Sequence, residues 1–175
     1  MNVCVFASSS AALLPAHGEM AAELGRELAR AGHTLVFGGC HLGLMGAVVQ
    51  AVKANGGRAV GVIPAELQAR GRASEICDEL VITSDLRERK AVMEARSEAF
   101  VALPSGIGTL DELAEAITHR LLRLHHKPVI VLDHAGYWAP LLALLDVLEE
   151  RQATPGLGEL YEVATSAADV VARLG

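Results

Sequence analysis

Short runs of β-branched and other apolar residues alternate along the chain with longer segments in which apolar residues recur at helical spacing. This alternation is typical of βαβ units built around a parallel sheet. We predict strands at 3–7, 34–37, 58–63, 80–83, 99–103, 128–132 and 161–164. We predict helices at 17–31, 43–54, 85–97, 109–124, 137–151 and 167–174. The polar stretch 65–77 has no clear period and is predicted to be a loop.

Helix boundaries follow from local signals. Gly32 is expected to end the first helix, and Asn55-Gly56-Gly57 the second. Ser84 or Asp85 is a suitable N-cap for the helix after the fourth strand. A chain of 175 residues suits one core, and no repeat or linker composition divides it. We therefore expect one α/β domain over 1–175, a Rossmann-like parallel sheet with helices on both faces.

Composition narrows the possible partners. Apolar residues make up 51% of the chain and charged residues 21%, as in soluble globular proteins. The net charge is -6, and no Lys/Arg cluster with interleaved aromatic residues is present, which argues against nucleic acid as a partner. No apolar run approaches the roughly 20 residues of a transmembrane helix, and the N-terminus lacks the features of a signal peptide. We expect no membrane association.

The three cysteines are Cys4, Cys40 and Cys77. They are widely spaced, odd in number and without a C-x-x-C pair, so neither a disulfide framework nor a zinc site is indicated. A cytoplasmic location fits best. His119, His125 and His126 lie near the end of one predicted helix, which favours interaction with the helix dipole over metal binding. We expect no metal and no cofactor.

Ligands of open parallel sheets bind at the carboxyl ends of the strands. Small residues and glycines follow three predicted strands, at 8–10, 38–46 and 105–109. The serines at 8–10 either contact a ligand or serve only as an approach to the next helix. The turn at 38–46 matches neither the dinucleotide fingerprint nor the P-loop. Its neighbours Cys40 and His41 are disfavoured as nucleophile and base, because adjacent residues rarely present both groups to one atom.

The turn at 105–109 offers backbone N–H groups at a helix N-terminus, which favours a phosphate. Two structural alternatives stay open. The glycines could serve only for close packing of the helix on the strand. Thr109 and Glu112 form a Thr-x-x-Glu capping box, which is the favoured interpretation of Glu112 from this turn alone.

The helix at 85–97 carries Leu86, Arg89, Met93 and Arg96 along one face. The ordinary expectation for Arg89 is a surface ion pair with a nearby glutamate, namely Glu88, Glu94 or Glu98. However, this helix begins near the same sheet edge as the 105–109 turn, so Arg89 could bind an anion there. Tyr137 and Trp138 are expected to pack within a helix.

Two stretches together resemble a known family: Glu88-Arg89-Lys90-Ala91-Val92-Met93, and 99–112 with the sequence AFVALPSGIGTLDE. They are similar to the R-K pair and the P-G-G-x-G-T-x-x-E signature of the LONELY GUY family. Members of that family are cytokinin riboside 5′-monophosphate phosphoribohydrolases, long mislabelled lysine decarboxylases. Gly38-Gly39, the 43–46 stretch GLMG and Lys127-Pro128-Val129 extend the resemblance over nearly the whole chain.

The resemblance implies hydrolysis of the N-glycosidic bond of a purine 5′-monophosphate by a homodimer whose active site lies near the subunit interface. It implies that Arg89 and Glu112 are the catalytic pair. It also implies a phosphate on the 106–109 turn. The full set of substrate-binding residues expected on this basis is Ser9, Gly39, Lys90, Met93, Ser105, Gly106, Ile107, Gly108 and Thr109.

Three positions depart from the family pattern. Ser105 replaces the second signature glycine, Leu86 replaces a usual Met, and Ala7-Ser8-Ser9 stands where Cys-Gly-Ser-Ser is common. Ser105 keeps open an alternative function, a non-catalytic carrier or sensor that binds a nucleotide or molybdopterin. A carboxylate near a phosphate site argues against that alternative, because it would repel the ligand. No lysine has a recognisable pyridoxal phosphate context, which argues against a decarboxylase.

Overall fold

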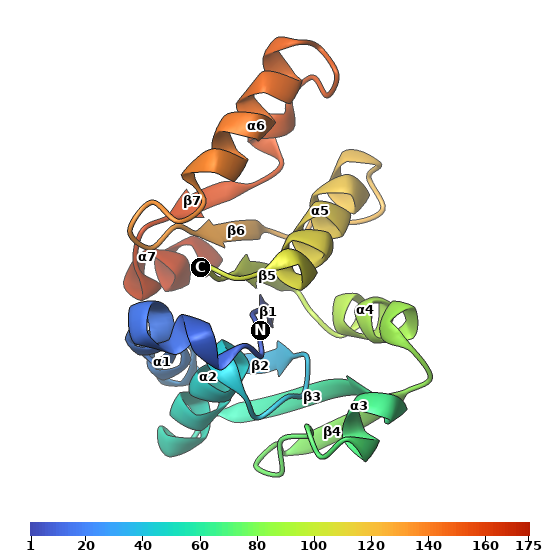
Figure 1. The fold of residues 1–175 in the computed structure, drawn as a ribbon. Coiled ribbons are helices and arrows are strands. Elements are labelled where there is room, and N and C mark those ends of the chain that lie inside the picture. Colours follow the sequence, from blue (N-terminus) through green and yellow to red (C-terminus); the bar gives the residue numbers. More distant parts are fainter.

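Seven strands form one sheet in the order β4-β3-β2-β1-β5-β6-β7 (Figure 1). The computed structural model describes residues 1–175, and every neighbouring pair of strands is parallel. The strands are β1 (Asn2–Phe6), β2 (Thr34–Phe37), β3 (Arg58–Pro64), β4 (Glu79–Thr83), β5 (Ala99–Ala102), β6 (Val129–Leu132) and β7 (Glu162–Ala164). The α-helices are α1 (Leu14–Arg30), α2 (Gly43–Ala54), α3 (Ala65–Ala69), α4 (Leu86–Ala95), α5 (Ile107–Leu121), α6 (Ala139–Glu150) and α7 (Ala167–Leu174). The predicted α/β fold is confirmed.

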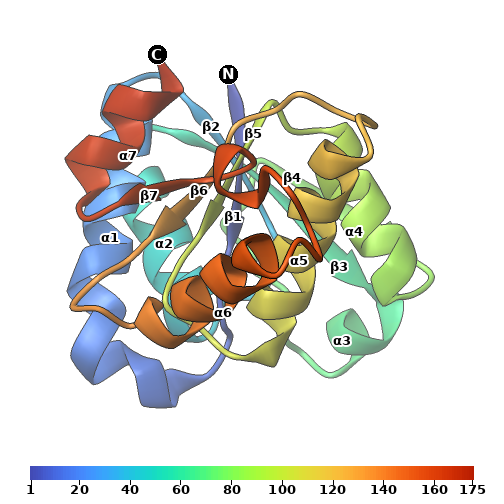
Figure 2. The ribbon, with the colours of Figure 1, turned by 90° about the horizontal axis from the view of Figure 1, so that it is seen from above.

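Helices cover both faces of the sheet (Figure 2). One buried cluster joins the strands to α1, α2 and α7, and includes Leu24, Val48 and Val170. The other joins them to α4 and α5, and includes Met93 and Leu113. Because successive side chains of a strand point to opposite faces of the sheet, the buried strands contribute side chains to both clusters. The central strands therefore lie between two apolar layers and are shielded from water on each side.

The strand order reverses next to β1. From β1 the chain builds outward to β4, and then α4 carries it back so that β5 pairs with the other edge of β1. The turns that follow β1 and β5 therefore lie beside each other, and the Leu103 N–H donates to the Phe6 carbonyl at 3.0 Å. Such a topological switch point is where open α/β sheets bind ligands.

Most predicted boundaries hold to within a few residues, and three differ for local reasons. α1 begins at Leu14 because Pro15, with its fixed φ, fits the first turn of a helix. The predicted loop 65–77 contains the short helix α3, which starts directly after Pro64. α5 begins at Ile107, two residues before the predicted start, with Gly106 as its N-cap.

Two predicted signals are confirmed. The Asp85 side chain caps α4 by accepting from the N–H groups of Arg87 and Glu88. Gly32, with φ of 72°, follows α1 in the left-handed conformation that favours glycine. In addition, none of the helices combines the length and hydrophobicity needed to cross a bilayer.

Candidate active site

A cavity of about 390 Å³ lies at the switch point, where the turns after β1 and β5 meet α2 and α4. Its lining is formed by Ala7, Ser8, Ser9, Met45, Leu86, Arg89, Lys90, Gly106, Ile107, Gly108, Thr109, Asp111 and Glu112. A second cavity of similar volume, beside α2, includes His41, Gln50 and Glu75 but none of the predicted binding residues. The first cavity is therefore the candidate active site.

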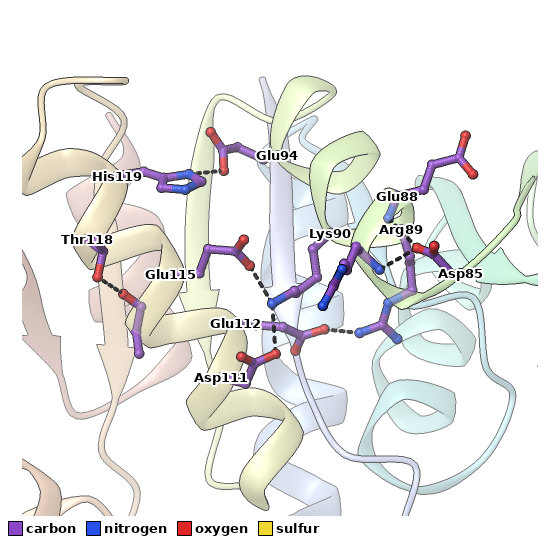
Figure 3. Close-up of polar contacts among 12 residues, drawn as sticks. Asp85, Glu88, Arg89, Lys90, Glu94, Asp111, Glu112, Glu115, Thr118 and His119 are labelled. Atoms are coloured by element: carbon purple, nitrogen blue, oxygen red, sulfur yellow. Dashed lines mark hydrogen bonds and ion pairs between the residues drawn. The ribbon is translucent and has the colours of Figure 1, made fainter.

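A buried ion pair lies at this cavity. Arg89 projects from α4 and its Nη2 donates to Oε1 of Glu112 on α5 (Figure 3). The two side chains are 11% and 5% exposed. Charges so poorly solvated persist only when they are paired and hydrogen-bonded. Each of these two residues is thus the main electrostatic partner of the other.

The ordinary interpretations of Arg89 and Glu112 are wrong. Glu88 accepts hydrogen bonds from Ser84 instead of Arg89, and Glu94 is paired with His119. Since α5 starts at Ile107, Glu112 falls in its second turn, where it cannot complete a capping box at the N-terminus.

The packing interpretation of the signature glycines is also wrong. A Cβ atom added to Gly106 or Gly108 would meet no heavy atom within 4 Å. Packing of α5 on the sheet therefore does not require glycine at either position. Both residues instead line the cavity, where a missing side chain leaves room for a ligand.

Burial governs the protonation of Glu112. Desolvation raises the pKa of its carboxyl group from 4.5 to about 7, although the Arg89 guanidinium acts in the opposite direction. Asp111 and Glu115 raise this pKa further by repulsion, and Lys90 lowers it. At neutral pH the carboxyl group is therefore able both to accept and to release a proton, as a general acid–base group requires.

Two buried polar atoms at the cavity have no partner within the chain. They are Nε of Arg89 and Oγ1 of Thr109. An unsatisfied buried polar atom is costly, and in native structures it commonly indicates a bound water, ion or ligand. Thr109 lies in the first turn of α5, where no side chain caps the helix. The leading N–H groups of α5 are thus available to an anion, together with the Thr109 hydroxyl.

Lys90 is engaged by carboxylates next to this site. Its ammonium lies 2.9 Å from Oδ2 of Asp111 and 2.7 Å from Oε2 of Glu115 (Figure 3). These residues flank Glu112 on α5. Lys90 therefore pairs with two carboxylates near Glu112, offsets part of their negative charge and links α4 to α5.

The sequence of this chain matches a family of known proteins. The family described as possible lysine decarboxylase matches residues 45–174. A cytokinin riboside 5′-monophosphate phosphoribohydrolase of Arabidopsis thaliana is 41% identical over 174 residues, which cover 99% of this chain and 82% of that protein. The enzyme of the same name from Mycobacterium tuberculosis is 42% identical, over 97% of this chain and 91% of that protein. This chain belongs to the LONELY GUY (LOG) family.

Solved structures extend the comparison beyond enzymes. The molybdenum cofactor carrier protein of Chlamydomonas reinhardtii superposes with a TM-score of 0.73 at 26% identity, covering 99% of this chain and 94% of that one. This chain is thus related in sequence to phosphoribohydrolases, and its fold is also similar to that of a carrier protein.

The structure brings most of the residues predicted from the LOG signature to one cavity. These are Ser9, Arg89, Lys90, Gly106, Ile107, Gly108, Thr109 and Glu112. Three others do not line it. Met93 is buried in the core, and Gly39 adopts φ of 69° at a position where an added Cβ would lie 2.9 Å from Cβ of Ile63. The buried Ser105 turns its hydroxyl to the backbone of Ser8.

The sequence does not single out two residues of the cavity, nor Tyr137, which lies outside it. Met45 lies in the glycine-rich turn region and Asp111 adjoins Glu112, so both positions were marked by motifs but not by their chemistry. Tyr137 was expected to pack within a helix, yet it precedes α6 and its hydroxyl donates to the Ser105 carbonyl at 2.7 Å. No local pattern signals a contact between residues so distant in sequence.

The raised pKa of Glu112 predicts a pH-dependent stability. Its pKa in the folded chain is about 7, above the usual 4.5, so folding favours the protonated form. The stabilisation is complete below pH 4.5 and is lost as pH rises through about 7. A shift of this size corresponds to about 3 kcal/mol. We expect urea unfolding to show this loss in the wild type relative to Glu112→Gln, and equal pH dependence of both proteins would contradict it.

Proposed function

We propose that this LOG-family chain is a single nucleotide-binding domain that hydrolyses the N-glycosidic bond of a purine nucleoside 5′-monophosphate. The base is adenine or the substituted adenine of a cytokinin riboside, and the products are the free base and ribose 5-phosphate. The observation that carries the proposal is the buried Arg89–Glu112 pair beside the uncapped N-terminus of α5. The names of the related phosphoribohydrolases support it.

The phosphate of the nucleotide is assigned to the start of α5. Gly106 and Gly108 leave open space, and the helix dipole and free N–H groups attract an anion. The unpaired Thr109 hydroxyl supplies a further donor. This placement directs the ribose toward Arg89 and Glu112, which line the same cavity.

Glu112 carries the chemistry of bond cleavage. The transition state of N-glycoside cleavage resembles an oxocarbenium ion, which a nearby carboxylate stabilises. The ionised Glu112 accepts a proton from the attacking water as the C–N bond breaks and the C–O bond forms. Glu112 then releases this proton, the departing base takes up one proton, and the hydroxyl of the water ends on ribose 5-phosphate.

Arg89 has a different task. A guanidinium does not lose its proton in proteins, so Arg89 is not a general acid. Its Nη2 holds the Glu112 carboxylate, while its buried Nε lacks a partner and is free for the substrate. We assign Arg89 to substrate orientation and to lowering the pKa of Glu112, which increases the ionised fraction of its carboxyl group.

A homodimer with its active site near the subunit interface is part of the proposal. Ile107 is 81% exposed and Leu86 is 55% exposed, and both lie at the cavity. Large apolar side chains exposed next to a binding site commonly mark an interface. Light scattering on the purified protein tests this proposal, and a monomer at all concentrations would contradict it.

We also propose a cytoplasmic location. All three cysteines are free, and Cys4 and Cys40 are buried. Unpaired cysteines are typical of reducing compartments. Fractionation of the producing cells tests this assignment, and recovery of the protein outside the cytoplasm would contradict it.

A carrier of a phosphorylated cofactor is the alternative, suggested by the structural similarity to the molybdenum cofactor carrier. A carrier would use the start of α5 but has no need for a buried carboxylate beside it, since negative charge repels the ligand. The Arg89–Glu112 pair therefore favours the enzyme.

Comparing AMP with adenosine tests the proposal. We expect release of adenine from AMP only, because adenosine lacks the phosphate that α5 binds. Cleavage of both substrates at equal rates would contradict the assigned phosphate site. Tight binding of AMP without any cleavage would favour the carrier.

A further inference from the structure

Ser105 forms hydrogen bonds to two other loops at the edge of the sheet where the cavity lies. Its side chain is buried, and its Oγ accepts a hydrogen bond from the Ser8 N–H at 3.0 Å. Its carbonyl oxygen accepts from the Tyr137 hydroxyl at 2.7 Å. Neither Ser105 nor Tyr137 lines the cavity. Both residues therefore reach the site only through the backbone that they hold.

The connection continues to α2. The Ser8 carbonyl accepts from the Met45 N–H at 3.3 Å, close to the start of that helix. Gly43 permits this approach, because a Cβ there would lie 2.5 Å from the Ser9 carbonyl carbon. Three hydrogen bonds thus run in series from the loop after β6, through the turns after β5 and β1, to α2.

Tyr137 itself is firmly positioned. Its ring packs edge-on against His17 and Trp138, each at a centroid distance of 5.2 Å. The buried Trp138 is anchored in turn, since its backbone N–H donates to Oδ1 of Asp133 at 2.7 Å. A hydroxyl group held on such a packed ring can fix the orientation of the peptide to which it bonds.

The bonded peptide is the one that opens the proposed phosphate site. The Ser105 carbonyl and the Gly106 N–H belong to the same planar trans peptide unit and point in opposite directions. A hydrogen bond that holds the carbonyl therefore also sets the direction of the N–H. Gly106 lines the cavity and is the N-cap of α5.

We propose that Tyr137 is a positioning residue that orients the Ser105–Gly106 peptide for anion binding, and that the Ser105 hydroxyl ties this turn to Ser8. This inference rests on the proposed function only in that the anion is taken to be the nucleotide phosphate. Ser105 is thereby a structural replacement for the signature glycine: its hydroxyl bonds to the Ser8 N–H and its side chain does not line the cavity.

Tyr137→Phe is the direct test, because it removes the hydroxyl and keeps the ring that packs on His17. Loss of one hydrogen bond should weaken AMP binding about threefold to tenfold. The same loss is expected for inorganic phosphate as a minimal probe. The kcat at saturating AMP should stay within about twofold, since Tyr137 does not touch the reacting atoms. Amide hydrogen exchange across 106–109 should become faster.

Tyr161→Phe is the matched control, because Tyr161 lies beside Asp146 and Glu149 of α6 and the hydrogen bond to the Ser105 carbonyl comes from Tyr137. It should leave affinity and exchange at wild-type values. Ser105→Ala should reproduce the loss of affinity, and it should also speed exchange at the Ser8 amide. Unchanged affinity and unchanged exchange in Tyr137→Phe would overturn the inference, as would a fall in kcat with affinity intact. Exchange and phosphate binding decide the matter even if the wild type cleaves no nucleotide.

Discussion

Replacing Glu112 with glutamine should lower kcat for AMP about a thousandfold while AMP still binds. The amide keeps the size of the side chain and an oxygen that accepts from Arg89, so the cavity retains its shape. It cannot become negatively charged, which removes both stabilisation of the oxocarbenium-like ribose and proton acceptance from water. General acid–base groups contribute roughly 10²- to 10⁴-fold to rates. Steady-state kinetics and calorimetric titration with AMP measure the two effects separately.

The pH profile adds a second readout to this variant. Because ionised Glu112 is the active form and its pKa is about 7, wild-type turnover should rise with pH through that value. The residual turnover of Glu112→Gln should not follow that rise. Glu27→Gln on α1 is a suitable control, since Glu27 forms a surface ion pair with Arg30 on the opposite face of the sheet. Wild-type activity in Glu112→Gln would refute the assigned role.

Replacing Arg89 with alanine should impair both catalysis and stability. Without the guanidinium, the pKa of Glu112 rises above about 7, so the carboxyl group is protonated at neutral pH and no longer acts as a base. Loss of an oriented charge at the reacting centre costs about 10²- to 10³-fold in kcat. Removing one member of a buried pair also destabilises a protein by about 3 kcal/mol. Turnover of AMP and urea unfolding are the measurements.

The stability effect should depend on pH. At pH 8 the buried Glu112 carboxyl group tends to ionise but has no guanidinium to pair with, so Arg89→Ala should show its largest loss of stability at this pH. At pH 5 the carboxyl group is neutral in the folded chain, and the loss should be smaller. The double variant Arg89→Met with Glu112→Gln should regain stability but not activity. Failure of the double variant to regain stability would contradict the described coupling between Arg89 and Glu112.

The sequence predicts the fold well because its signals are local. Apolar periodicity identifies the strands and most helices, Gly32 ends α1, and Asp85 caps α4. Helices and helix boundaries that depend on the conformation of the neighbouring backbone are less predictable. α3 was not recognised because its five residues are too short to show a period. The start of α5 was misplaced because its N-cap is Gly106, whose backbone adopts the required conformation without a capping side chain.

The candidate site was only partly accessible from sequence. The motif residues identify the cavity, but local chemistry alone favoured a capping box for Glu112 and a surface ion pair for Arg89. The two residues meet because α4 and α5 pack against the same face of the sheet. Burial, which sets the pKa of Glu112, is likewise a property of that packing. Met93 shows the opposite kind of error. Its spacing places it on the same helix face as Arg89, yet its side chain is buried in the core.

The most direct test of the proposed activity is quantitative detection of both products. Purified protein is incubated with AMP or isopentenyl-AMP, and free base and ribose 5-phosphate are measured by chromatography and mass spectrometry beside Glu112→Gln. The account predicts equal amounts of base and ribose 5-phosphate from the wild type and almost none from the variant. Absence of both products from the wild type, with AMP bound at the cavity, would contradict it.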